Sequence, residues 1–74
     1  MFIKDIKISN RLNLARTQSG LTQENLAKVL GVTRQTISAI EKGTYVPSIQ
    51  LALKMAKYFK QPVESLFWLS DDDK

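Results

Sequence analysis

Two short helical patterns that meet at a glycine occupy the middle of this chain, over residues 21–43. The apolar residues of the first pattern recur at helical spacing: Leu26, Val29 and Leu30, with Ala27 between them. This spacing predicts one apolar face on a helix over residues 23–30. Thr22 can cap that helix, and Gly31 accepts the positive φ that ends it. A chain that turns this sharply between two short helices has few folds available to it.

The second pattern follows almost at once, because the segment Gly31, Val32 and Thr33 is too short to form a free loop. Thr33 can cap this helix, and Gly43 ends it. Ile37 and Ile40 form its inner face. The side chains that point the other way are mostly polar: Gln35, Ser38, Ala39 and Lys42, flanked by Arg34. Two short helices joined by a glycine-containing turn are typical of a helix-turn-helix, whose second helix enters the DNA major groove.

Together with the segments TYVPSIQLALKMAKYF and VESLFW, this stretch resembles the Cro/C1-type (xenobiotic-response-element, XRE) helix-turn-helix DNA-binding domains of bacteria and phages. The resemblance covers about residues 10–69, with the helix-turn-helix over 22–42, and is strongest toward short stand-alone dimeric repressors such as the cytolysin operon repressor. It implies an all-α, five-helix, lambda-repressor-like domain. It also implies a sequence-specific transcriptional regulator that binds double-stranded DNA, has no cofactor and is not an enzyme.

The composition is compatible with this resemblance and excludes several kinds of site. A chain of 74 residues makes one domain, whose single core supplies only about 3–5 kcal/mol of net stability, so help from a second subunit is expected. There is no Cys and no His, which excludes disulfides, a thiol nucleophile and the usual zinc sites. The acidic residues are scattered outside the tail, so neither a metal site nor a catalytic site is predicted.

The net charge of +4 understates the basic character of the domain. The last four residues carry a net charge of −2, which leaves +6 on residues 1–70. Such a body suits a polyanion, although many small proteins are modestly basic. No apolar run approaches the ~20 residues that span a bilayer, and the start MFIKDIKISN lacks the apolar core of a signal peptide. We expect a cytoplasmic protein with no membrane partner.

The two ends of the chain have their own patterns. Residues 1–9 alternate between two faces and carry β-branched isoleucines, which favours a short N-terminal strand. The resembled fold does not need this strand, but some short members pair an N-terminal strand with a C-terminal one, so a two-stranded sheet or hairpin is one of two alternatives. Residues 70–74 form an acidic tail, which we expect to be a disordered, solubilising end, although it also resembles part of a protease-cleavage tag.

Ser9 or Asn10 can cap a first helix that runs to about Ser19 and is closed by Gly20. The residues expected toward the core are Leu12, Ala15 and Ser19. The resemblance pairs an arginine on this helix, Arg16, with a glutamate of the third helix, Glu41. The alternative is two separately solvated charges, and even a real pair can serve geometry more than stability.

Arg34 and Gln35 are the strongest candidates for reading DNA bases. A cation at the first helical position opposes the helix dipole by roughly 0.3–1 kcal/mol, so folding gives no reason for Arg34 to be there. Arginine can donate two hydrogen bonds to guanine, and glutamine can pair with adenine. Thr36 and Ser38 are weaker candidates, because a hydroxyl serves a base edge or a phosphate equally well. Solvated surface residues are the alternative.

A second set of residues is predicted to contact phosphates: Thr22, Gln23, Thr33, Lys42, Thr44 and Tyr45. Helix N-termini such as that at Thr22 are natural phosphate sites, and the resemblance gives Gln23 this role. Lys42 also has a structural explanation, because a cation in the last turn suits the helix dipole. The loop with Thr44 and Tyr45 runs along the DNA backbone in the resembled family.

The fourth helix, capped by Ser48, is apolar on most sides. One stripe contains Ile49, Ala52, Leu53, Ala56 and Phe59, and a second contains Leu51, Met55 and Tyr58. This pattern predicts a central core helix surrounded by the others, or else a helix with a dimer seam. Pro62 begins a last short helix over about 63–66.

The apolar run Phe67, Trp68 and Leu69 is predicted to be a subunit contact, because aromatic residues are enriched at interfaces. A homodimer would place two recognition helices roughly 34 Å apart and would bind a near-palindromic operator. No feature suggests a small-molecule effector. The alternative function is a protein-interaction module, such as an antitoxin or an antirepressor.

Overall fold

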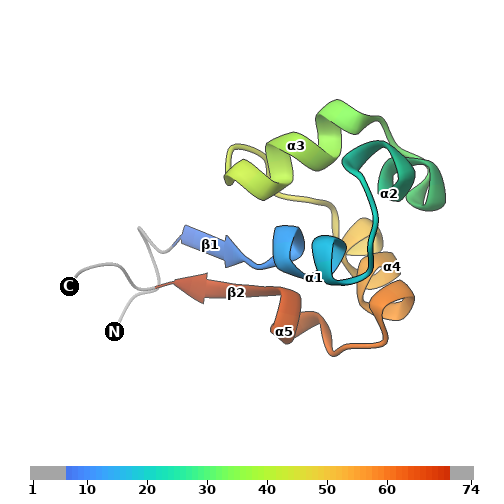
Figure 1. Ribbon diagram of the computed structural model, residues 1–74. Coiled ribbons are helices and arrows are strands. Elements are labelled where there is room, and N and C mark those ends of the chain that lie inside the picture. Colours follow the sequence, from blue (N-terminus) through green and yellow to red (C-terminus); the bar gives the residue numbers. More distant parts are fainter. Residues whose placement is uncertain (1–6, 71–74) are drawn as a thin grey trace, which may run out of the picture.

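The computed structural model describes residues 7–70, which form a small helical body and a two-stranded ribbon that projects from it (Figure 1). In chain order the elements are β1 (Lys7–Asn10), α1 (Leu12–Gln18), α2 (Gln23–Leu30), α3 (Arg34–Lys42), α4 (Ile49–Phe59), α5 (Val63–Leu66) and β2 (Phe67–Ser70). The predicted five-helix fold is therefore confirmed, and so is the sheet made from the two terminal segments.

The ends of α2 and α3 form as the sequence predicts. The Thr22 hydroxyl oxygen accepts a hydrogen bond of 3.0 Å from the backbone N–H of Asn25 at the start of α2. The Thr33 hydroxyl accepts one of 3.2 Å from the N–H of Thr36 at the start of α3. Gly31 has a φ of 79°, which allows the chain to leave α2 and turn directly into α3.

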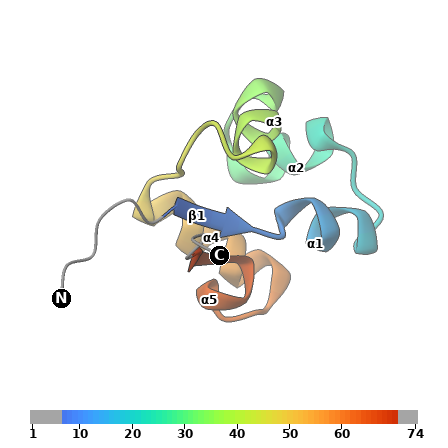
Figure 2. The ribbon, with the colours of Figure 1, turned by 90° about the vertical axis from the view of Figure 1, so that its left-hand side faces the viewer.

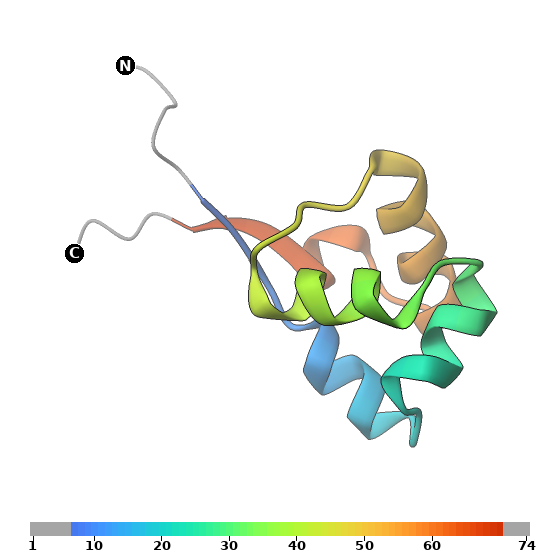
Figure 3. The same ribbon diagram turned by 90° about the horizontal axis from the view of Figure 1, so that it is seen from above.

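The ribbon is antiparallel, with Lys7 opposite Ser70 and Asn10 opposite Phe67. Ile8 faces its cross-strand partner Leu69 on one side of the ribbon, while Trp68 lies on the other side, because side chains alternate along a strand. Seen from above, the two strands run side by side away from the helices (Figure 3). The rest of the predicted N-terminal strand and residues 71–74 of the predicted tail lie outside the described residues, whereas Ser70 ends β2.

Asn10 joins the ribbon to two helices. Its side-chain oxygen accepts a hydrogen bond of 3.0 Å from the backbone N–H of Leu12. The N-cap of α1 is Arg11 and not Ser9 or Asn10, so Asn10 bonds to the first turn from the position before the cap. Its Nδ2 donates a hydrogen bond of 2.9 Å to the backbone carbonyl of Ile40 in α3. The ribbon is thus bonded to both α1 and the last turns of α3.

All five helices contribute to one core. When the molecule is viewed along the ribbon, α2 and α3 lie above, α1 to one side and α5 below (Figure 2). The buried side chains are Leu12, Ala15, Leu26, Ala27, Leu30, Ile37, Ile40, Leu51, Met55, Ala56 and Leu66. This core presses α3 against the rest of the body through its two isoleucines and leaves its opposite side exposed.

Several predicted core positions are wrong. Ser19 is exposed, and Val29 is 50% exposed. The helix α4 is not a central helix surrounded by the others: Leu51, Met55 and Ala56 face the core, whereas Ile49 is 78% and Leu53 54% exposed. Apolar residues cover so much of α4 that periodicity cannot decide which side packs inward, and only its contacts with α2 and α5 do so.

Candidate nucleic-acid interface

The outer face of α3 is an exposed polar surface built from residues one turn apart. Six residues line a shallow hollow of about 350 Å³ on this face: Arg34, Gln35, Ser38, Ala39, Lys42 and Thr44. Five of these are predicted DNA contacts. No acidic side chain lines the hollow, so a polyanion would meet only cationic or neutral groups there.

Arg34 and Gln35 are the most available of these side chains. Both are exposed, and neither forms a side-chain hydrogen bond or ion pair with any other residue between 7 and 70. Arg34 begins the helix, and the buried Ile37 and Ile40 hold the opposite face against the core. The two side chains therefore stand on a rigid helix end with all their donors unused.

Thr36 and Tyr45 lie apart from this outer face. Thr36 is half-buried, and its hydroxyl lies 3.1 Å from that of Thr33, within hydrogen-bond distance. Thr36 and the half-exposed Tyr45 both line a separate hollow beside the start of α4. Thr44, in contrast, faces the outer surface, and its hydroxyl donates to the carbonyl of Ala39 at 3.2 Å.

An ion pair between Arg16 and Glu41 fixes α1 against α3. The Nε of Arg16 lies 2.6 Å from Oε2 of Glu41, and Nη2 donates to Oε1 at 3.2 Å. The Nη1 of Arg16 also donates to the carbonyl of Leu21 at 2.8 Å. The two side chains are 11% and 6% exposed, so they are not separately solvated charges. The pair that the resemblance implies is present.

Two further amides donate to the same carboxylate. Nδ2 of Asn13 and Nε2 of Gln23 donate to Oε1 of Glu41 at 3.2 and 3.0 Å. Burial alone would raise the pKa of Glu41, but the hydrogen bonds from Arg16, Gln23 and Asn13, together with the charge of Arg16, lower that pKa below its ordinary value. Glu41 therefore stays ionised and holds three helices together.

Sequence reasoning missed the part that Asn13 and Gln23 play in this network. Asn13 could have been found, because it lies three residues before Arg16 and so shares its helix face. Gln23 was predicted to contact phosphate, but the structure commits one of its two amide hydrogens to Glu41. Its other N–H group is left for a second acceptor. Thr22 and Thr33 are exposed at the helix starts, where they cap α2 and α3.

The helix-turn-helix family model matches residues 7–66 of the chain. The chain belongs to the Cro/C1-type helix-turn-helix family of transcriptional regulators. Membership makes it a DNA-binding regulator and not an enzyme.

The chain is 53% identical over 66 residues to the uncharacterised HTH-type transcriptional regulator MJ0272 of Methanocaldococcus jannaschii. The aligned region covers 89% of this chain and 100% of that protein. It is 47% identical, with the same coverage, to the uncharacterised regulator YgzD of Bacillus subtilis. Among solved structures, the restriction-modification controller protein C.AhdI of Aeromonas hydrophila is similar, with a TM-score of 0.66 and 31% identity over 73% of this chain and 78% of that one.

The ribbon of this helix-turn-helix regulator does not present its apolar run as one surface. Phe67 packs against the core, and the Arg11 guanidinium lies 5.0 Å from the centre of the Trp68 ring on the other side. Leu69 is 60% exposed beside Ile8. Ile8 also lines a small hollow with Val46, which is 57% exposed. We call Ile8, Val46 and Leu69 the ribbon patch.

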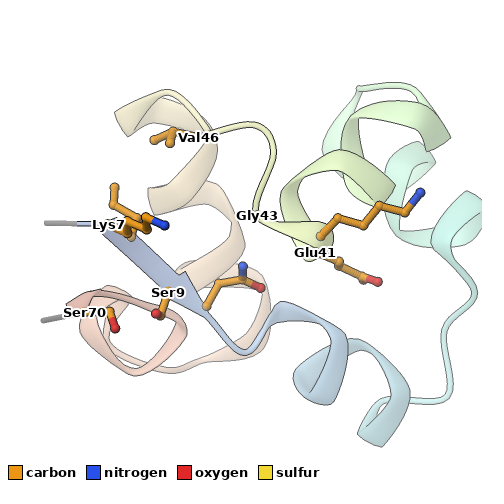
Figure 4. Close-up of a pocket in the computed structure, with 9 residues that line it drawn as sticks. Lys7, Ser9, Glu41, Gly43, Val46 and Ser70 are labelled. Atoms are coloured by element: carbon orange, nitrogen blue, oxygen red, sulfur yellow. The ribbon is translucent and has the colours of Figure 1, made fainter. Parts of the chain in front are cut away.

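A wide cleft of about 850 Å³ separates the ribbon of the regulator from the C-terminal end of α3 (Figure 4). Lys7, Ser9 and Ser70 lie on the ribbon side, and Glu41 and Gly43 lie on the other. Lys42 lines both this cleft and the hollow on the outer face of α3. Lys42 thus stands at the border between the cleft and the outer face of α3.

Within residues 7–70 no helix is long and apolar enough to cross a membrane. Across the same residues, no three His, Cys, Asp or Glu side chains gather where they could hold a metal ion. The surface with the most obvious chemistry is therefore the outer face of α3.

Proposed function

We propose that this regulator is a sequence-specific repressor that binds a near-palindromic operator as a cytoplasmic homodimer. The observation that carries the proposal is the state of Arg34 and Gln35: both are exposed on the first turn of α3, and neither is used within residues 7–70. The first turn of a recognition helix is the part that reaches base edges in the major groove. Unpaired donors at this place are of use to a DNA reader and of none to the fold.

Arg34 reads a guanine through its O6 and N7 acceptors, and Gln35 pairs with an adenine. Ser38, one turn further along the same face, reaches a neighbouring base edge. Because its hydroxyl is bonded to Thr33, we assign Thr36 to the backbone side of the groove rather than to a base.

The phosphate contacts surround this base-reading face. Lys42 and Thr44 line its far edge, and Thr22 and Thr33 stand at helix N-termini, which attract anions. The remaining N–H of Gln23 and the half-exposed Tyr45 add contacts at the sides. These groups set the position of the protein on the duplex and carry little sequence information.

A second copy of the chain covers the ribbon patch in this proposal. Ile8, Val46 and Leu69 are apolar and uncharged, so the same patch can oppose itself across a two-fold axis. Ile49 and Leu53 extend the exposed apolar surface along α4. The two recognition helices would then lie about one helical turn of DNA apart, roughly 34 Å, and the bound dimer would block RNA polymerase.

The test is selection of bound sites from a random duplex library at two salt concentrations. A short inverted repeat whose affinity falls steeply with salt supports the proposal. A single enriched half-site would keep the DNA-reading role of α3 but remove the dimer. If no sequence is enriched, the sequence-specific role is wrong.

A protein-interaction role, such as that of an antitoxin or an antirepressor, is the second candidate. The observation that favours it is an exposed apolar groove between α2 and α4, which shares no residue with the outer face of α3. The two roles are compatible, because a DNA-binding regulator can use another surface for a protein.

A further inference from the structure

The groove between α2 and α4 is formed by apolar side chains that the fold leaves uncovered. It has a volume of about 270 Å³ and is lined by Val29 and Leu30 from α2 and by Lys54, Lys57 and Tyr58 from α4. Val29 is 50% exposed and Tyr58 is 41% exposed, although both belong to apolar stripes in the sequence. Neither the core nor the proposed DNA-facing surface accounts for the apolar character of Val29 and Tyr58.

The Tyr58 ring is held in place. It packs edge-on against the ring of Phe59, with ring centroids 5.1 Å apart, and Phe59 itself packs against the core. A ring that is already fixed loses little conformational freedom when a partner covers it, and tyrosine is enriched where proteins bind proteins. The groove thus has an ordered aromatic wall before any partner arrives.

The rim of the groove is cationic. The Nζ of Lys54 donates a hydrogen bond of 2.8 Å to the carbonyl of Leu30, which fixes the ammonium beside the end of α2. An ammonium has three N–H donors, so two are left for a ligand. Lys57 is exposed, and neither lysine forms an ion pair within residues 7–70. No acidic side chain lines the groove.

We propose that the α2–α4 groove binds an acidic, amphipathic segment of another protein, which places an apolar side chain between Val29 and Tyr58 and its carboxylates on Lys54 and Lys57. Charge complementarity selects this partner. The apolar walls offer nothing to a phosphate backbone, so DNA would use only part of the site. A second copy placed by a two-fold axis would oppose lysines to lysines, which is repulsive.

The groove borders the other two surfaces of the regulator but is centred on different residues. It shares no lining residue with the hollow around Arg34. Ile49, which extends the ribbon patch, and Tyr58 are about two and a half turns apart at 3.6 residues per turn, so they point to opposite sides of α4. Leu30 and Lys54 also line the hollow that contains Thr36 and Tyr45. A bound partner would therefore stand beside the DNA-facing side of the regulator and not on Arg34 itself.

The probe is a fluorescein-labelled amphipathic peptide of glutamates with central leucine and phenylalanine side chains, measured by fluorescence anisotropy on the full chain. Two peptides serve as controls: one with lysines in place of the glutamates, and one with alanines in place of the apolar residues. We expect only the acidic, apolar peptide to bind. Backbone amide shifts in ¹⁵N NMR spectra should then change around Val29 and Tyr58 and not around Arg34.

Matched variants locate the site. Lys57→Glu should weaken peptide binding about tenfold, whereas Lys28→Glu, which changes an exposed lysine outside the groove, should not. Tyr58→Ala should also weaken it, whereas Leu14→Ala, at an exposed apolar position on α1 outside the groove, should not. Circular dichroism checks that each variant is folded, and the NMR map tests the site in the unchanged protein.

Several outcomes would overturn the proposal. Equal binding of the alanine-substituted peptide would mean that the lysines attract any polyanion. Displacement of the peptide by random duplex DNA would assign the groove to the DNA footprint. Amide shifts that cluster on the ribbon patch, or no binding at millimolar peptide, would show that the groove is not the docking site.

Discussion

Arg16 and Glu41 are joined by a hydrogen bond of 2.6 Å between Nε and Oε2, which fastens α1 to the recognition helix. The carboxylate also accepts hydrogen bonds from Asn13 and Gln23, so α1, α2 and α3 meet at a single charged group. The orientation of α3 therefore depends on the ionisation of one glutamate.

Glu41→Gln should remove a pH-dependent part of the stability. Because the pKa of Glu41 is lower in the folded protein than in the unfolded chain, its contribution is present at neutral pH and is lost as the pH falls through the folded-state pKa. We expect the variant to lose about 2 kcal/mol of unfolding free energy near neutral pH, and this difference to shrink toward acid. Urea denaturation at several pH values measures it. The control is Glu64→Gln, an exposed glutamate without an ion pair in the described region, and an unchanged gap at low pH would contradict the prediction.

Arg34→Ala should weaken binding to the selected operator by about 1–3 kcal/mol and relax the preference at one base pair. The residue is exposed and unpaired within residues 7–70, so the fold should not change. Affinities for the operator and for single-base variants of it measure the effect. Equal losses on operator and random DNA would show that Arg34 contacts only the backbone.

Lys42→Ala should weaken binding to all DNA sequences alike. Lys42 stands at the edge of the outer face of α3, where we expect its ammonium to contact a phosphate rather than a base edge. Losing one phosphate contact should lower the slope of log affinity against log salt by about one. A salt titration with specific and random duplexes checks this, with Lys60→Ala, a lysine remote from α3 in the chain, as the comparison. A loss confined to the operator would contradict it.

Gly31→Ala should destabilise the protein by about 1–2 kcal/mol through the backbone alone. Gly31 has a φ of 79°, and a Cβ built there meets no atom within 4 Å, so the cost is conformational and not a steric clash. Gly31→Asn should cost less, because asparagine tolerates this conformation better. Thermal unfolding of both variants measures the difference. Equal losses of stability in the two variants would show that the left-handed backbone conformation of Gly31 is not the cause.

Leu69→Lys should convert the proposed dimer to a monomer. Leu69 is 60% exposed, so the monomer fold has little need of it, whereas a charge in the ribbon patch would meet its own copy across a two-fold axis. Sedimentation velocity at several protein concentrations measures the change. Leu14→Lys, at a 48% exposed position on α1, is the control. A variant that stays dimeric would show that the subunit interface does not include the ribbon patch.

Local signals predicted the helix-turn-helix well, because the caps at Thr22 and Thr33 and the turn at Gly31 depend on residues close in the chain. They failed for α4, where Ile49 and Leu53 are exposed although they belong to the longer apolar stripe. Which side of such a helix packs inward is decided by its neighbours in space.

In the candidate site, too, local features could be predicted from the sequence and contacts between distant residues could not. Arg34 is singled out by a charge placed against the helix dipole, which is a local argument, and its base-reading role stays a prediction. The bond from Gln23 to Glu41 joins residues 18 positions apart, and the one from Lys54 to Leu30 joins residues 24 apart. Neither follows from spacing along the chain, because both depend on how α2 is placed against its neighbours.

The side chain of Asn10 bonds the ribbon to α1 and to Ile40 of the recognition helix at once. A ribbon held in this way cannot swing without carrying α3 along. In a dimer joined through its ribbons, the distance between the two α3 helices would be set by a short, stiff connection rather than by a flexible one. Such a regulator would accept one spacer length between operator half-sites and reject sites that are a single base pair longer or shorter.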